Sequence, residues 1–429
     1  MVGVLLSAVM GTIVQPVQGQ PTFGPTLNLS SNSGGSYAPK IAVSGSNIYV
    51  LWRDDTPGNP EVFFRRSTDN GVTFDAVINL SNNTGESFLF QSIVASGSNV
   101  YVVWYDDTLG NYDVLFRRSA DGGATFESVV NLSNNPGNSI YLGVAASGSN
   151  VYVAWVDNSL GNYERFFRRS TDSGATFGDV ANLSNTPGTT YAGDIAVSGS
   201  NVYVSWSDDT SGNLESFFKR STDNGVNFDP AINLSNNPGY SFGALIRVSG
   251  TNVYALWADN TPGSLDWFFR RSIDSGASFG PVIDLSNARS GVGIGLGFAA
   301  SGSNVYVVWD NSGPASSAIF YRRSTDNGAT FTKTTKLSGG SPNSYAPSIA
   351  VSGSNVYVAF GNNVVGGTGE IFFRASSDNG ATFGNTLNLS NNSGSSYAPP
   401  ALAASGTNVY VAWYDGTPGN FEILFRADQ

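Results

Sequence analysis

The sequence predicts an all-β fold, an eight-bladed β-propeller of four-stranded antiparallel blades, closed by an N-terminal strand that completes the last blade. Three observations support this expectation. A motif repeats with a strict period, each repeat contains four short apolar segments separated by turn residues, and one repeat is divided between the two ends of the chain.

The repeating motif has the form Ser-x-Asp-x-Gly-x-Thr-Phe, first seen as "STDNGVTF" at 67–74, and it recurs every 51 or 52 residues. A second marker, "SGSNVYV" and its variants, occurs in eight copies from Ser44 to Ser405. Repeats of this length share one core, so the chain need not divide into several domains. The aspartates of the first motif are Asp69, Asp121, Asp172, Asp223, Asp274, Asp326 and Asp378.

Each repeat contains four segments with strand character, which in the first repeat begin at "KIAV" (40–43), "NIYVLW" (47–52), "EVFFRRS" (61–67) and "FDAVINLS" (74–81). The connections between them are rich in Gly, Asn, Asp, Ser and Pro, which supply turn geometry. No helical periodicity appears. One such unit cannot bury two apolar faces alone, so the copies must pack side by side.

The two ends of the chain indicate a closed ring. The chain finishes in "FEILFRADQ", a third segment without its fourth, while the N-terminal part supplies "PTFGPTLNLS", a fourth segment without its predecessors. Pairing the two would leave no open sheet edge. An open solenoid is the alternative, although it gives no reason to divide one unit between the ends.

Residues 1–19 are set apart from the repeats by an uncharged apolar run, 2–14, that is too short to cross a bilayer as a helix. Small residues at Val17 and Gly19 have the spacing of a secretory cleavage site, although no Lys or Arg precedes the run. We therefore expect 1–19 to be a signal peptide, with a retained hydrophobic arm as the alternative, and 20–429 to be a single secreted or cell-surface propeller domain.

Composition excludes several classes of function. The formal net charge of −11 opposes nucleic acids and anionic lipid surfaces, so we expect neither nucleic-acid binding nor membrane insertion of the mature domain. Cys and His are absent. Thiol chemistry, histidine-based catalytic triads and ordinary zinc hydrolases are thereby excluded.

The Ser-x-Asp-x-Gly-x-Thr-Phe motif resembles the Asp box, or BNR repeat, of sialidases and related secreted propellers. The resemblance implies a hairpin between the third and fourth strands of each blade, on the face away from the sialidase active site. It also implies that each Asp caps backbone amides while the aromatic packs into the blade. We therefore expect the seven motif aspartates to be structural.

Sialidases bind the substrate carboxylate with three arginines, and no such set can be recognised in this chain. Most of its 21 Lys and Arg residues occupy two repeated positions; the others, which share no motif, are Lys40, Arg53, Arg165, Arg247, Arg289, Lys333 and Lys336. We therefore expect a non-catalytic binding or assembly module. The alternative is an enzyme, a sialidase-like glycoside hydrolase.

Ligand-binding residues are expected on the face opposite the motif hairpins, where the loop before each first strand carries a recurring aromatic residue. Aromatic rings beside Asn and Asp suit a glycan or an extracellular protein, and a second copy of the chain is a further candidate partner. The alternative is that each ring fills the gap between blades. The set is Tyr37, Phe88, Tyr141, Tyr191, Phe242, Tyr345 and Tyr397.

We predict no cofactor and no metal site, although oxygen-rich loops such as "DDTPGNPE" leave calcium open as an alternative. Asn-x-Ser/Thr triplets supply N-glycosylation acceptors if the host modifies secreted proteins. The plain alternative is ordinary repeat sequence. These acceptors are Asn28, Asn79, Asn82, Asn131, Asn182, Asn233, Asn388 and Asn391.

Overall fold

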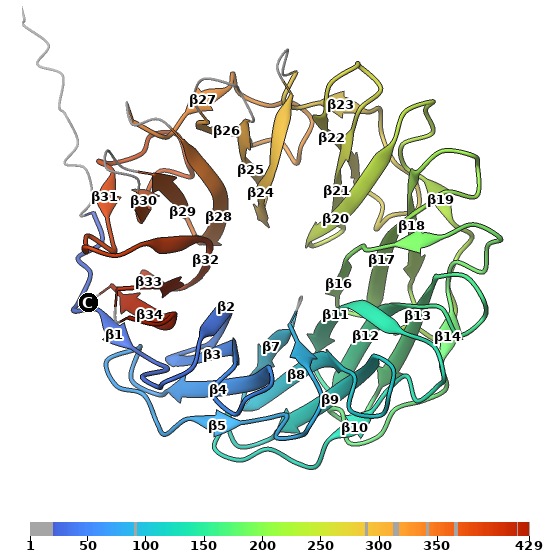
Figure 1. Ribbon diagram of the computed structural model, residues 1–429. Coiled ribbons are helices and arrows are strands. Elements are labelled where there is room, and N and C mark those ends of the chain that lie inside the picture. The colour runs from blue at the N-terminus through green and yellow to red at the C-terminus, as the bar shows by residue number, and fades with distance from the viewer. Residues whose placement is uncertain are drawn as a thin grey trace, which may run out of the picture.

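A computed structural model describes residues 20–89, 92–287, 291–311, 317–339, 343–363, 368–417 and 419–428. The expected signal peptide, residues 1–19, and Arg289 lie outside this part of the chain. The described residues form β-strands and no helix, grouped into eight antiparallel sheets. These sheets stand around a central axis like the blades of a propeller (Figure 1). The predicted eight-bladed fold is therefore confirmed.

Every blade has an innermost strand beside the axis, followed outward by a second, a third and a short outer strand. The innermost strands are β2 (Ser36–Ser44), β6 (Ser87–Phe88) with β7 (Ile93–Ser96), β11 (Ser139–Ser147), β15 (Thr190–Tyr191) with β16 (Ile195–Ser198), β20 (Ser241–Ser249), β24 (Val292–Ser301), β28 (Ser344–Ser352) and β32 (Ser396–Ser405). The second strands are β3 (Asn47–Asp54), β8 (Asn99–Asp106), β12 (Asn150–Asp157), β17 (Asn201–Asp208), β21 (Asn252–Asp259), β25 (Asn304–Asn311), β29 (Asn355–Asn363) and β33 (Asn408–Asp415).

The third strands are β4 (Glu61–Ser67), β9 (Asp113–Ser119), β13 (Glu164–Ser170), β18 (Glu215–Ser221), β22 (Asp266–Ser272), β26 (Ile319–Ser324), β30 (Gly369–Ser376) and β34 (Glu422–Ala427). The outer strands are β5 (Ile78–Asn79), β10 (Val130–Asn131), β14 (Ala181–Asn182), β19 (Ile232–Asn233), β23 (Ile283–Asp284), β27 (Thr335–Lys336), β31 (Leu387–Asn388) and β1 (Leu27–Asn28). We number the blades one to eight in the order of their innermost strands.

The second strands are apolar on both faces because each blade is enclosed by its two neighbours. Trp104 of the second blade, for example, packs in one cluster with Leu51 and Phe64 of the first. The tryptophans near the ends of these strands are at most 2% exposed, as a core between blades requires: Trp52, Trp104, Trp155, Trp206, Trp257, Trp309 and Trp413.

The strand register defines two faces of the ring. Asp54 pairs with Ser36 on one side and Glu61 on the other, so the first strand begins, the second ends and the third begins on the same face, here called the upper face. The lower face carries the tight turns between first and second strands, and the hairpins after each third strand. In the first of these turns Gly45 has a φ of 62°, a conformation that suits glycine.

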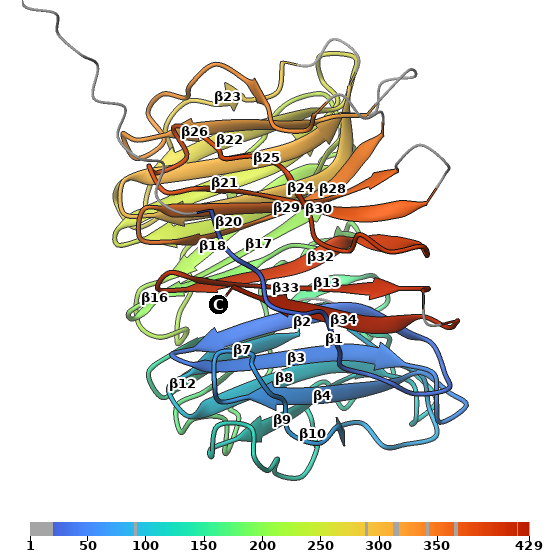
Figure 2. The same cartoon turned by 90° about the vertical axis from the view of Figure 1, so that its left-hand side faces the viewer.

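The N-terminal strand lies in the last blade. β1 pairs with β34 in antiparallel register, with Leu27 opposite Phe425 and Asn28 opposite Leu424. The Leu29 amide donates to Ile423 O at 2.7 Å. Figure 2 shows β1 beside β33 and β34. The sheet order β1-β34-β33-β32 makes this blade four-stranded although its strands come from opposite ends of the chain.

Candidate functional site

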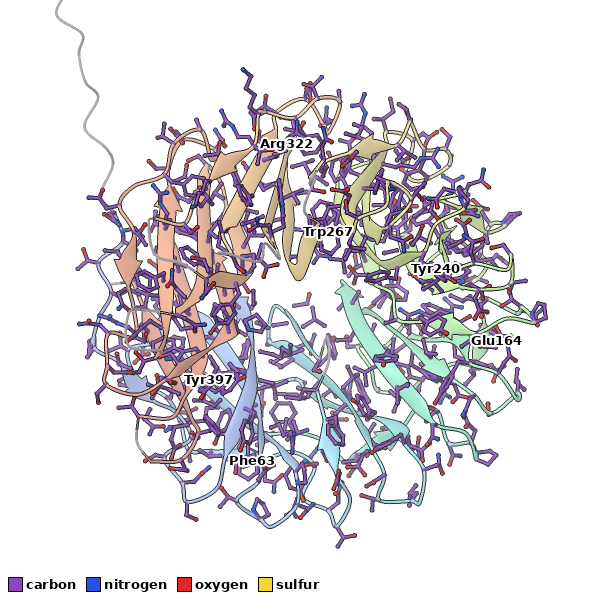
Figure 3. The ribbon with its side chains drawn as sticks, turned by 45° about the horizontal axis from the view of Figure 1, so that its top comes forward. Phe63, Glu164, Tyr240, Trp267, Arg322 and Tyr397 are labelled. Atoms are coloured by element: carbon purple, nitrogen blue, oxygen red, sulfur yellow. The ribbon has the colours of Figure 1, made fainter. Side chains whose placement is uncertain are left out.

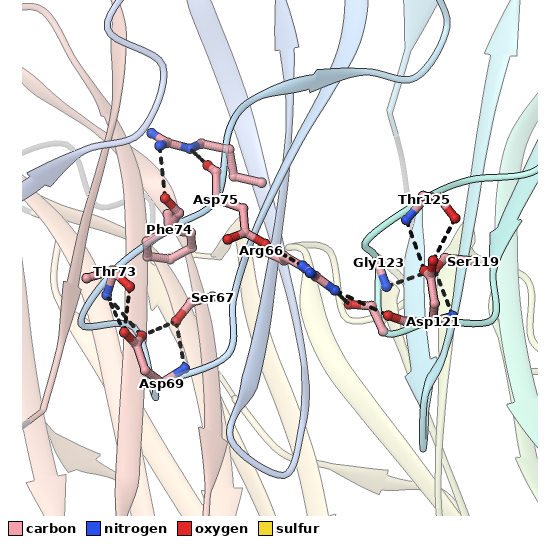
Figure 4. Close-up of polar contacts among 12 residues, drawn as sticks. Arg66, Ser67, Asp69, Thr73, Phe74, Asp75, Ser119, Asp121, Gly123 and Thr125 are labelled. Carbon is pink, nitrogen blue, oxygen red and sulfur yellow. Dashed lines mark hydrogen bonds and ion pairs between the residues drawn. The ribbon is translucent and has the colours of Figure 1, made fainter.

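The repeated aspartates lie in the lower-face hairpins, where each carboxylate is bound by its own turn (Figure 4). Asp69 accepts hydrogen bonds from Ser67 Oγ at 2.7 Å and from the Thr73 amide at 2.9 Å. Donation by the Thr73 hydroxyl and amide lowers the pKa of Asp69 to about 2. The same hydrogen bond from a serine hydroxyl to the aspartate, at 2.6–2.7 Å, recurs at Asp121, Asp172, Asp223, Asp274, Asp326 and Asp378.

The aromatic residue of each hairpin packs against the preceding blade. The Phe74 ring meets the Phe425 ring edge-on with centroids 5.0 Å apart, and Phe126 meets Phe64 at 4.9 Å. Gly71 lies so close to this joint that an added Cβ would stand 2.9 Å from the Phe425 ring. The hairpins therefore join neighbouring blades, and we look for the functional site on the upper face.

The acidic side chains at the upper ends of the strands are engaged in local hydrogen bonds. Asp54 accepts from Ser36 Oγ at 2.8 Å, Asn32 Nδ2 at 2.6 Å and the Thr56 amide at 2.9 Å. Burial raises the pKa of Asp54, but hydrogen bonds from Thr56, Trp52 and Ser36 outweigh it, and the net effect lowers the pKa. Within the described ranges no group of three or more acidic side chains could hold a metal ion.

The seven predicted aromatic residues differ in their surroundings. Tyr37, Phe88, Tyr345 and Tyr397 are partly buried. Tyr141 is 40% exposed, Tyr191 43% and Phe242 36%. The structure brings only some of these rings together: Tyr37 and Tyr397 share partners, whereas Tyr191 and Phe242 lie on the other half of the ring.

The rings that do meet form a continuous row across blades eight, one and two, here called the aromatic arc: Tyr397, Tyr414, Phe421, Tyr37, Arg53, Phe88, Tyr105 and Tyr112. At one end, Tyr397 stacks on Tyr414 with centroids 5.1 Å apart and an angle of 6°. At the other, Phe88 stacks on Tyr105 at 5.3 Å and 15°.

Arg53 lies in the middle of the aromatic arc and joins its two halves. Its guanidinium carbon lies 5.6 Å from the centre of the Tyr37 ring and 5.2 Å from that of Phe88, which are cation–π distances. Arg53 Nη2 also forms an ion pair with Asp55 Oδ1 at 3.2 Å. The arc therefore combines aromatic faces with a positioned cation.

Sequence reasoning missed most of the aromatic arc because its key members do not repeat. The residue that follows the second-strand aromatic is Arg53, Tyr105 and Tyr414 in blades one, two and eight, but it becomes Val156, Ser207, Ala258, Asp310 and Gly361 in the others. In the sequence, the variation at this one position indicated the arc. If the position served only the packing that all blades share, its residue would be the same in every blade.

Exposed apolar side chains lie on the upper face, as the aromatic arc does. Leu109 is 68% exposed and Leu160 64%, each in the upper-face loop after the second strand of its blade. The corresponding residues in blades one, four and five are Pro57, Ser211 and Pro262.

Comparison with known proteins supports the fold. No protein-family model matches the chain, and no match was found among curated proteins. An ulvan lyase of polysaccharide lyase family PL25, solved with bound -[GlcA(1-4)Rha3S]-, aligns with a TM-score of 0.54 and 10% identity over 82% of this chain and 96% of the lyase.

Two further solved structures align with lower scores. A Hadza microbial sialidase has a TM-score of 0.41 and 12% identity over 89% of this chain and 73% of its own. YCF48 bound to a peptide has a TM-score of 0.45 and 12% identity over 96% and 97%. The chain is thus an eight-bladed β-propeller, the fold that the alignment with the ulvan lyase supports.

Proposed function

We propose that the protein is a non-catalytic recognition module, secreted or displayed at the cell surface, that binds a glycan or an extracellular protein through the aromatic arc. The observation that carries the proposal is that Arg53, Tyr105 and Tyr414, at a position that does not repeat in the other blades, lie among the rings of blades eight, one and two. A residue needed only for packing between blades would recur around the ring, as the buried tryptophans do.

The chemistry of the aromatic arc supports recognition. Flat ring faces stack on the apolar faces of sugars or on apolar side chains, and tyrosine hydroxyls add hydrogen bonds at the edges. Arg53, held over two rings, offers a charge that an acidic ligand would meet. A glycan is the ligand class we favour, since stacked tyrosines beside polar loops combine both kinds of contact.

The alternative is a sialidase-like glycoside hydrolase, which would need acidic side chains free to act as general acid and base. Asp54 and its counterparts Asp106, Asp157 and Asp259 each accept a hydrogen bond from the serine that begins the neighbouring strand. Because these carboxylates accept the same structural hydrogen bond in each blade, they support a binding role over a catalytic one. Incubation with a panel of fluorogenic glycosides should release no product; saturable turnover that Tyr414→Ala abolishes would reverse the assignment.

Binding is tested by screening the purified protein on a glycan array and measuring the affinity of the best hit by calorimetry. Arg53→Ala and Tyr414→Ala should each weaken binding about fivefold or more, since losing one stacked ring or cation costs about 1 kcal/mol or more. The matched control is Tyr240→Ala, which removes a 57% exposed tyrosine from the upper face of the fifth blade. Figure 3 shows Tyr240 and Tyr397 on opposite sides of the ring. Equal losses in all three variants would refute a role for the arc.

Association with a second copy of the chain belongs to the same proposal. Leu109 and Leu160 are exposed leucines beside the arc, and two copies could bury them together. Light scattering of the full chain should then give a mass above one chain that falls to the monomer in a Leu109→Ser, Leu160→Ser double variant. A monomeric wild type would remove self-association from the proposal.

A further inference from the structure

The innermost strands surround a cavity of about 350 Å³ on the axis of the ring, here called the central channel. Its size lies within the range of roughly 300–1,000 Å³ that small-ligand sites occupy. Its wall combines polar groups with apolar side chains, and Ile41, Ile93, Val144, Leu296, Ile349 and Leu402 are among the lining residues. The channel lies apart from the aromatic arc, none of whose members lines it.

Two cations and no carboxylate line the central channel, in a chain whose formal net charge is −11. Lys40 comes from β2 in the first blade and Arg247 from β20 in the fifth. These two strands face each other across the axis (Figure 1). The channel is therefore positive on two opposite walls.

Arg247 is held in place by contacts with the two blades on either side of its own. Its Nη1 donates to Asp194 Oδ2 at 2.7 Å, its Nε donates to Phe298 O at 2.9 Å, and its guanidinium lies 5.7 Å from the centre of the Phe298 ring. Its Nη2 donates no hydrogen bond to any described residue, and the side chain is 38% exposed. Arg247 thus presents unused N–H donors at the wall of the channel.

Lys40 differs from Arg247 because it has no ion pair and no hydrogen bond to any side chain in the described ranges. It is partly buried, and that burial lowers its pKa. An ammonium group removed from water without a partner costs free energy. A bound anion would offset this cost.

The cations cannot be explained by a packing need common to the blades. The position of Arg247 is occupied in the other blades by Ala42, Val94, Ala145, Ala196, Ala299, Ala350 and Ala403. The position of Lys40 is occupied by Ser92, Gly143, Asp194, Leu245, Gly297, Ser348 and Ala401. Small or neutral side chains serve at nearly all of these places, so the fold alone does not require a cation at either.

We propose that the central channel binds an oxyanion, a sulfate, phosphate or carboxylate, whose direct partner is the Lys40 ammonium, while Arg247 adds positive charge from the opposite wall. Because both cations are partly withdrawn from bulk water, their attraction for an anion is stronger than that of fully exposed charges. Asp194, which is 3% exposed, orients Arg247 from behind and does not face the channel.

The test is calorimetric titration of the full chain with sodium sulfate and, separately, sodium acetate, with chloride keeping the ionic strength constant. We expect one site per chain for at least one of the two anions; sulfate identifies a tetrahedral oxyanion and acetate a carboxylate. Lys40→Met should weaken this binding at least tenfold. The control Lys333→Met removes an exposed lysine of the same charge and should leave binding unchanged.

A second measurement separates an anion site from a structural role for Lys40. The thermal unfolding midpoint of Lys40→Met without added anion should equal or exceed that of the wild type, because an unpaired, partly buried charge is removed. Arg53→Ala should bind the anion as the wild type does. Absence of saturable binding in the wild type, or equal binding by the Lys40→Met and Lys333→Met variants, would overturn the proposal.

Discussion

Arg65 Nη1 donates a hydrogen bond of 2.9 Å to Leu29 O, across the boundary at which the first and last blades meet. The same guanidinium donates through Nε to Asp75 O of its own hairpin at 2.7 Å. An equivalent Arg or Lys side chain donates a hydrogen bond to a leucine carbonyl of the preceding blade at each of the remaining boundaries. The pairs are Arg117–Leu80, Arg168–Leu132, Lys219–Leu183, Arg270–Leu234, Arg322–Leu285, Arg374–Leu337 and Arg426–Leu389. The repeated cations are therefore part of the joint between blades.

Lys219 is the exception in this series and allows the joint to be tested. Its Nζ makes one bond, to Leu183 O at 2.8 Å, whereas Arg117 makes three. We expect Lys219→Arg to raise the free energy of unfolding by about 1–2 kcal/mol, since each added bond contributes roughly 0.5–1.5 kcal/mol. Chemical denaturation measures the change. The reciprocal variant Arg117→Lys should lower stability by a similar amount, and a change of the same sign in both variants would disprove this account.

The buried side chain of Leu29 allows the N-terminal segment to be compared with its repeat equivalent. Leu29 is 1% exposed in the last blade and Leu80 is 0% exposed in the first. If β1 packs as tightly as the outer strands that follow their own blades, Leu29→Ala and Leu80→Ala should each cost about 2–5 kcal/mol. Thermal unfolding of the two variants gives the comparison. A small loss for Leu29→Ala beside a large one for Leu80→Ala would mean that the last blade is loosely closed.

The hairpin aspartates predict a fall in stability in acid. Hydrogen bonds from Thr73 lower the pKa of Asp69 to about 2, and those from Ser272 and Ser278 lower that of Asp274 to about 2, from the ordinary 3.8. A group with a lowered folded pKa stabilises the protein above its unfolded pKa, and this contribution is lost as pH falls through the folded value. Stability should therefore decrease between about pH 4 and pH 2.

The variant Asp69→Asn isolates this effect, because the amide does not titrate. It should be less stable than the wild type near neutral pH, and the difference should shrink near pH 2, as followed by urea denaturation at the two pH values. The control Asp179→Asn alters an exposed carboxylate for which the structure gives no hydrogen bond. A difference for Asp69→Asn that stays constant with pH would argue against the bound carboxylate as its source.

The fold could be predicted from the sequence because the residues that form it recur: the buried second strand, the turn glycines and the hairpin Phe each appear once per blade. The aromatic arc could not, since Tyr37 meets Phe421 only after the two ends of the chain meet. Arg247 departs from the repeated basic positions, yet its partner Asp194 lies 53 residues away in the sequence, and their ion pair depends on the alignment of adjacent blades.

The acceptor asparagines should differ in N-glycosylation because their amide nitrogens differ in access. Nδ2 of Asn131 and of Asn182 is buried, and Oδ1 of each accepts a turn amide, at 2.8 Å from Asn134 and 3.0 Å from Asn185. A glycan on either nitrogen would have to open its turn. Asn82 and Asn391 are exposed.

In a host that glycosylates secreted proteins we therefore expect glycans at Asn82 and Asn391 in preference to Asn131 and Asn182. Glycopeptide mass spectrometry measures the occupancy of each site in the folded, secreted protein. Asn82→Gln and Asn391→Gln together should remove most of the attached glycan mass, whereas Asn131→Gln and Asn182→Gln should remove little. Full occupancy at Asn131 would show that the sugar is added before this turn forms, and that the folded ring tolerates an opened turn at its rim.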